Sequence, residues 1–329
     1  MTATTTAEQA APSRLQNFPI TFFATSMGFG GLTLALRAAA EPLGLGTAPF
    51  RAALAATVTV FGLVALVYAV KAARYWRAVH AEWHHPVRLA FFPTVSVSIL
   101  LMSIAFLSVS RQAAELLWLF GTGLQGVLTL AVITGWIGTR SFMHGHLNPA
   151  WFIPAVGNVI VPVAGAQLGY SETSWLFFSA GIMFWVILLT LVFNRLVFHD
   201  PMPGRLQPTL VIMIAPPSVA FIAWVRMQGE TAGIDAFGHI LLSLGYVFAA
   251  LVLVQLPRIL KLPFAMSFWA LSFPLAALTI ASFVYAEKAA SQVHMWVGAG
   301  LLAALALLIA VLVGRTAVAI ARHEICHPE

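Results

Sequence analysis

Long stretches of apolar residues dominate the chain, and short polar breaks separate them. A helix that crosses the hydrocarbon core of a bilayer, which is about 30 Å thick, needs roughly 20 apolar residues. The strands of a membrane β-barrel would instead alternate apolar and polar positions over about ten residues. The pattern therefore predicts an all-α integral membrane protein with ten transmembrane helices. The predicted spans are about 18–36, 52–70, 89–109, 113–137, 151–169, 174–194, 206–225, 236–256, 264–285 and 293–320.

Two of the polar breaks, at 110–112 and 170–173, are so short that the helices on either side must form tight antiparallel hairpins. The predicted organisation is a polar N-terminal tail at 1–17, a transmembrane domain at 18–320 and a short C-terminal tail at 321–329. Composition agrees with this, because 60% of the residues are hydrophobic and only 9% are charged. Soluble domains carry about 25% charged residues, so a soluble enzyme and a nucleic-acid-binding domain are excluded.

The basic residues predict the orientation, because cytoplasmic loops of membrane proteins are enriched in Lys and Arg. If the N-terminus is cytoplasmic, twelve of the 17 Lys and Arg residues lie on the cytoplasmic side of the predicted spans. We therefore expect both termini in the cytoplasm, which an even number of spans requires.

Prolines lie inside the third, fifth, seventh and ninth spans, whereas the even spans carry them only at or beyond their ends. Proline removes a backbone hydrogen bond, and the freed carbonyl is more easily satisfied inside a bundle than against lipid. The alternation predicts five hairpins, each with one kinked inner helix and one straight outer helix. The prolines inside spans are Pro93, Pro154, Pro162, Pro216, Pro217 and Pro274.

No ionisable residue lies near the middle of any predicted span, although ion-coupled transporters usually place one there. The inner spans offer hydroxyl groups instead, among them Ser26, Ser96 and Ser272. A lumen of hydroxyls and loosened backbone without fixed negative charge favours an anion over a cation. The alternative is that these hydroxyls bond back to carbonyls of their own helices.

Three segments carry a resemblance to a known family. They are FFATSMG at 22–28, AEWHHPVR at 81–88 and WALSFPLA at 269–276. They resemble the tellurite-resistance/dicarboxylate transporter family, which includes bacterial TehA and the slow anion channels of plant guard cells. The likeness extends from about residue 19 to residue 320, and it is closer to the short bacterial members.

The resemblance implies ten helices in five hairpins around a quasi-fivefold central pore, assembled as a homotrimer with one pore in each subunit. It also implies a phenylalanine in the ninth helix that plugs the pore, and the matching position is Phe273. His85 and Arg88 lie in the second family-like segment and are expected at a basic cytoplasmic entrance. One departure is Ser26, where bacterial relatives carry a proline, although Gly28 still allows the backbone to bend or approach closely.

The resulting expectation is a bacterial inner-membrane anion channel or passive transporter for small monovalent anions such as chloride and nitrate. The alternative is a proton-coupled carrier of C4-dicarboxylates such as malate, with a link to tellurite resistance left open. A third interpretation is a metalloenzyme, because HEICH at 323–327 matches the zinc motif H-E-x-x-H. That motif lies at the very end of the chain, with no third ligand after it. We therefore expect no enzymatic activity, no bound metal and no cofactor. The expected partners are small anions, lipid and other subunits.

Overall fold

The computed structural model describes residues 13–138, 142–229 and 231–326, and this part of the chain is built from helices without strands. Nine described helical segments are long and apolar enough to cross a membrane. The one predicted span that is not among these nine is the first, 18–36, and it corresponds to the shorter helix α1, Phe23–Ala39, preceded by the 3-10 helix η1, Ile20–Phe22. The all-α membrane class is therefore confirmed, whereas the count of ten crossings stays a prediction.

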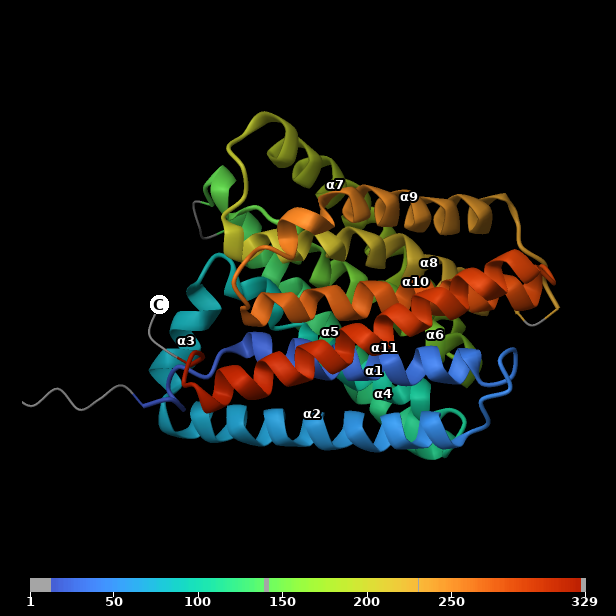
Figure 1. Cartoon of the computed structure of the whole chain (residues 1–329), viewed down its shortest axis with the longest axis horizontal. Helices are drawn as coiled ribbons and strands as arrows, with labels where there is room; N and C mark the ends of the chain where they lie inside the picture. Colours follow the sequence, from blue (N-terminus) through green and yellow to red (C-terminus); the bar gives the residue numbers. More distant parts are fainter. Residues whose placement is uncertain (1–12, 139–141, 230, 327–329) are drawn as a thin grey trace, which may run out of the picture.

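Five hairpins form the bundle, and in each the first helix is an inner helix and the second an outer one. The inner helices are α1, α4 (Thr94–Phe106), α6 (Phe152–Leu168), α8 (Ala215–Gln228) and α10 (Ser272–Lys288). Their outer partners are α2 (Ala48–Arg74), α5 (Arg111–Gly138), α7 (Ser171–Phe198), α9 (Ala236–Ile259) and α11 (Gln292–Ala321). A short additional helix, α3 (Trp76–His84), follows α2 (Figure 1).

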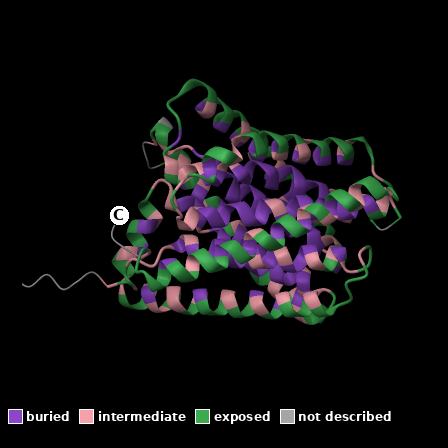
Figure 2. Cartoon of the chain, viewed as in Figure 1, coloured by how far each residue is buried: buried purple, intermediate pink, exposed green. Residues whose placement is uncertain are grey.

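The inner helices form a closed ring, because each contacts the next and α10 returns to contact α1. In an apolar stretch of 18 residues from each helix, 78–89% of the residues are buried in the four longer inner segments, against 17–33% in the outer helices. Figure 2 shows the same contrast, with buried residues gathered in the middle of the bundle. The predicted alternation of inner and outer helices is thus present, and the ring encloses a single axis.

The two ends of the described chain lie at one end of the bundle (Figure 1). The Arg14 guanidinium donates a hydrogen bond to the backbone carbonyl of Ile320 at 3.3 Å. We call this the terminal end and the opposite one the distal end. The shared end agrees with an even number of crossings, but the cytoplasmic location of the termini remains a prediction.

A buried polar cluster ties the second hairpin to the third. The Gln125 side chain of α5 accepts a hydrogen bond from Ser96 of α4 at 2.7 Å and donates one to the Pro154 carbonyl of α6 at 3.0 Å. Gly157 of α6 lies directly against this amide, since a Cβ built there would be 2.3 Å from Gln125 Nε2. The absence of a side chain at Gly157 is what lets Gln125 reach α6.

We predict that Gly157→Ala lowers the unfolding free energy by about 1–3 kcal/mol, because the methyl group displaces a hydrogen-bonded buried amide. Gly123→Ala is the matched control, because a Cβ there meets nothing within 4 Å. Alanine also favours a helix over glycine, so the control should be neutral or slightly stabilising. Thermal unfolding in detergent measures both variants, and equal shifts would contradict this packing.

Candidate anion pore

The axis of the inner ring is hollow over its distal half. A cavity of about 730 Å³ opens there, and all five inner helices contribute to its wall. We call this cavity the vestibule. Its deeper wall is apolar and includes Leu34, Leu101, Ile160, Val219 and Ala277, one residue from each inner helix.

A second and much smaller cavity, of about 30 Å³, lies on the terminal side, and we call it the inner cavity. Residues of all five inner segments line it as well, among them Ala24, Phe91, Ile153, Ala215 and Ala270. None of its described lining residues is charged. The two cavities therefore lie along one axis, surrounded by the same five segments.

Phe273 is the one described residue that lines both cavities. Its side chain is only 6% exposed, and Pro274 beside it lines the inner cavity. The phenyl ring thus stands between the vestibule and the inner cavity.

Local chain geometry explains why Phe273 stands there. The 3-10 helix η6, Met266–Leu271, changes into α10 at Ser272, so Phe273 is in the first turn of the α-helix. Proline is tolerated in that turn because its missing N–H has no helical partner there. Pro274 consequently marks the start of α10, and the Ser272 hydroxyl donates to the Trp269 carbonyl at 2.6 Å across the junction.

Glycines of α1 allow α10 to come close at this level. A Cβ at Gly28 would lie 2.5 Å from Ser272 Oγ, and one at Gly31 would lie 2.7 Å from the Ala276 Cβ. Gly31 also faces the Phe273 ring, whose Cδ2 would be 3.5 Å from that Cβ. Gly28, where the sequence allowed a bend or a close approach of the backbone, therefore lies at a close helix contact beside Phe273.

The junction at Phe273 recurs around the ring, because each inner α-helix follows a 3-10 segment. These segments are η1, η2 (Arg88–Phe91), η4 (Pro149–Trp151), η5 (Gly204–Ile214) and η6. The predicted kink prolines gather at these junctions: Pro93 precedes α4, and Pro154, Pro216 and Pro217 lie in the first turns of α6 and α8. Pro162 alone of the predicted kink residues lies well inside a helix, α6. The inner spans thus change helix type near the terminal end.

The three serines that the sequence offered as pore-lining candidates, Ser26, Ser96 and Ser272, are fully buried. They are not among the residues that line either cavity. Ser272 bonds back to its own segment, and Ser96 reaches both the Pro93 carbonyl at 2.9 Å and Gln125. Within the described structure, the Ser26 hydroxyl is buried without a hydrogen-bond partner. The walls of the cavities are instead formed mainly by aliphatic side chains.

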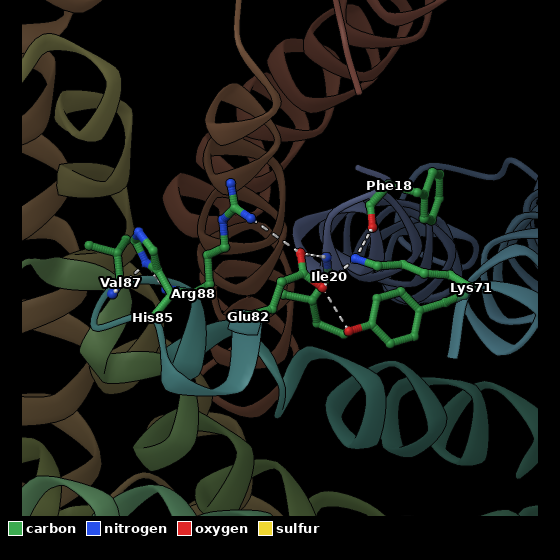
Figure 3. Close-up of polar contacts among 8 residues, drawn as sticks. Phe18, Ile20, Lys71, Glu82, His85, Val87 and Arg88 are labelled. Carbon is green, nitrogen blue, oxygen red and sulfur yellow. Dashed lines mark hydrogen bonds and ion pairs between the residues drawn. The ribbon is translucent and has the colours of Figure 1, made fainter. Parts of the chain in front are cut away.

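A buried ion pair joins helices at the terminal end of the bundle (Figure 3). The Glu82 carboxylate of α3 accepts hydrogen bonds from Lys71 of α2 at 2.7 Å and from the Tyr68 hydroxyl at 2.9 Å. The backbone N–H of Ile20 donates to the other carboxylate oxygen of Glu82 at 3.2 Å, and Lys71 also donates to the Phe18 carbonyl at 2.8 Å. Glu82 and Lys71 are 3% and 1% exposed, so this cluster joins the start of α1 to the first outer helix and α3.

The predicted basic entrance belongs to the same region (Figure 3). Arg88 extends toward Glu82, with 3.6 Å between the guanidinium and the carboxylate. The His85 ring accepts hydrogen bonds from the backbone N–H groups of Val87 and Arg88, at 3.2 and 3.3 Å. The imidazole thus shapes the turn that leads into η2, and the charge of Arg88 is partly offset by Glu82.

The C-terminal zinc motif lies only partly within the described chain. α11 ends at Ala321, so His323 and Glu324 do not continue the helix that H-E-x-x-H requires, and His327 lies outside the described residues. Burial raises the pKa of the Cys326 thiol, against the opposing pull of the positive charges on Arg14 and Lys71. The thiol is therefore protonated and weakly nucleophilic near neutral pH.

Sequence reasoning missed two arginines on the vestibule wall. Arg37 is near the end of α1 and Arg226 near the end of α8, and both line the vestibule together with Glu41 and Glu287. Their proximity to helix ends made them look like ordinary loop charges. Only the ring arrangement shows that they share one cavity.

Comparison with known proteins decides the family. Residues 17–317 match the voltage-dependent anion channel family SLAC1. The chain belongs to this family. It is consequently a multi-pass membrane protein of a family of anion channels and transporters, and that family is not one of enzymes.

Curated relatives are similar to most of the SLAC1-family chain. An uncharacterized transporter of Methanocaldococcus jannaschii is 26% identical over 88% of this chain and 91% of its own. A tellurite resistance protein TehA homolog of Haemophilus influenzae is 30% identical over 67% of this chain and 66% of its own. The guard cell S-type anion channel SLAC1 of Arabidopsis thaliana is 24% identical over 83% of this chain and 50% of its own. These matches confirm the resemblance that the three segments indicated.

We predict that Glu82→Gln destabilises the protein by about 3–5 kcal/mol, because Lys71 then keeps a buried charge without its counter-charge. The matched control is Glu324→Gln, since the Arg322–Glu324 pair is exposed and its atoms are 4.0 Å apart. Replacing both partners, with Lys71→Met and Glu82→Leu, should recover part of the loss. Thermal unfolding in detergent distinguishes these cases, and a harmless Glu82→Gln would contradict a structural role for the pair.

Proposed function

We propose that this SLAC1-family chain is a channel for small monovalent anions such as chloride and nitrate, with one pore in each subunit. The observation that carries the proposal is the position of Phe273 between two cavities on the axis of the inner ring. Removal of this one side chain would join the vestibule to the inner cavity. The ring of helices is then the conduit and the phenyl group its gate.

The chemistry of the wall supports a gate of this kind. An apolar constriction offers no groups to replace the water that an ion must lose, so a benzyl side chain blocks a narrow lumen. Apolar residues also surround Phe273 on both sides, including Leu34 and Ala277 in the vestibule and Ala24 in the inner cavity.

The distribution of charge supports an anion as the substrate. The charged residues that line the described cavities all lie toward the distal rim, and the deeper wall carries no carboxylate to bind a cation. With no charged group holding the ion at the constriction, selectivity follows the cost of dehydration. Weakly hydrated nitrate should then pass at least as well as chloride.

A second candidate function is a proton-coupled carrier of C4-dicarboxylates such as malate. One observation favours it, because Arg37 and Arg226 give the vestibule two positive charges that a dicarboxylate could pair with. The described lining of the inner cavity offers no ionisable side chain for a coupled proton, which favours the channel. The similarity to a tellurite resistance protein TehA homolog is compatible with both the channel and the carrier, because both would make the membrane permeable to anions.

The proposed setting is the inner membrane of a bacterium, with the terminal end in the cytoplasm and the chain assembled as a homotrimer. The distribution of Lys and Arg supports the orientation. Apolar side chains exposed along the outer helices, such as Leu66, Leu130 and Leu253, suit contact with lipid or with neighbouring subunits. The subunit number rests on the family resemblance, and mass determination of the detergent-solubilised protein tests it.

We predict that Phe273→Ala raises the anion current in planar bilayers by roughly tenfold or more. Lowering the free-energy barrier to anion passage by only about 1.4 kcal/mol already increases the rate of passage tenfold. The native chain should be silent or nearly so. Phe283→Ala is the matched control, because Phe283 is also on α10 and lines the vestibule but does not line the inner cavity. That control should stay as quiet as the native chain.

The reversal potential in a chloride gradient identifies the carried ion, and a preference for cations would contradict the channel proposal. The carrier alternative gains support if neither form conducts while liposomes accumulate malate in a saturable, proton-dependent manner. In that case Phe273 would be a packing residue.

A further inference from the structure

Arg37 and Arg226 occupy an unusual position relative to each other. They belong to α1 and α8, which are not neighbours in the inner ring because α10 lies between them. Both side chains nevertheless line the vestibule. Two like charges are thus brought together on the wall of one cavity.

Like charges placed near each other repel, and protein sites usually offset such repulsion with a counter-charge. Neither arginine makes an ion pair within 4.0 Å of a carboxylate among the described residues. The two carboxylates that line the vestibule belong to its rim, because Glu41 follows the end of α1 and Glu287 is the penultimate residue of α10. The counter-charge for the arginine pair is therefore not provided by a close contact within the described protein.

The hydrogen-bonding capacity of the pair is also largely unused. A guanidinium group has five N–H donors in a planar arrangement. Arg37 donates to the Ile104 carbonyl at the long distance of 3.5 Å. The remaining donors of the pair are available to water or to an anion in the vestibule. Arginine binds anions through several parallel hydrogen bonds, which a single ammonium group cannot do in a fixed geometry.

We propose that Arg37 and Arg226 together bind a small monovalent anion in the vestibule, ahead of Phe273. The functional part of this inference rests on the proposed anion channel. The bound anion offsets the repulsion between the two guanidinium groups and raises the local anion concentration in the vestibule. A site of this kind feeds a pore whose deeper wall is apolar and binds ions weakly.

The conduction test uses the Phe273→Ala chain, so that the gate does not limit the current. The double variant Arg37→Gln/Arg226→Gln should lower the unitary anion conductance by about threefold or more at low chloride, because local potential concentrates ions. The difference should largely disappear near 1 M salt, where the screening length falls to about 3 Å. Arg37→Lys/Arg226→Lys should keep most of the conductance.

Arg51→Gln is the matched control for these currents. Arg51 is an exposed arginine near the start of α2, at the same distal end, and is not among the residues that line the vestibule. Its replacement should leave the low-salt conductance unchanged. Equal conductance in the double glutamine variant and in Arg51→Gln at low chloride would overturn the arginine site while leaving the channel itself intact.

Bromide gives a readout that does not depend on conduction. Crystals of the full chain in bromide should show anomalous density between the two guanidinium groups, and this density should be lost in the double glutamine variant. Absence of bromide from the native vestibule would overturn the site. If Phe273→Ala does not conduct anions, the channel proposal fails, and the bromide density still decides whether the arginine pair binds an anion.

Discussion

The structure depends on one constraint, which is that backbone polar groups inside a bilayer need partners within the protein. Each inner segment changes from a 3-10 helix to an α-helix, mostly at a turn that carries proline, and such a change interrupts the regular hydrogen-bond ladder. Lipid cannot satisfy the groups that are freed. The five interrupted segments are therefore enclosed by five continuous outer helices, and the buried residues gather in the middle of the molecule (Figure 2).

The same interruption positions Phe273, the gate that we propose. Phe273 stands in the first turn of α10, immediately after the change of helix type, and Gly31 of α1 packs closely against Ala276 of α10 beside it. Small residues at this level bring α1 and α10 together. Charges lie away from this level: Arg37 and Arg226 toward the distal rim, and the Lys71–Glu82 pair at the terminal end.

Much of the fold could be predicted from the sequence because its signals are local. Apolar run length gives the helices, and the positions of Pro93, Pro154 and Pro274 indicate which of them are inner, since proline acts on its own turn. Contacts between distant helices carry no such signal. Lys71 and Glu82 looked like loop charges but form a buried pair, and Arg37 and Arg226 share a cavity only because the ring places α1 and α8 around one axis. The sequence could not decide whether Ser272 faces the lumen, and the structure shows its hydroxyl bonded to the Trp269 carbonyl.

The central claim is that Phe273 alone interrupts one continuous axial path. Single cysteines at Ala38 in the vestibule and at Ala24 in the inner cavity test it, because both positions are on α1, on either side of Phe273. Cys326→Ser removes the native thiol, and an anionic, membrane-impermeant thiol reagent is added on the vestibule side. The account predicts that Ala38→Cys reacts rapidly in every background and that Ala24→Cys reacts only when Phe273→Ala is also present. Fast reaction of Ala24→Cys with Phe273 intact, or no reaction after its removal, would contradict the account.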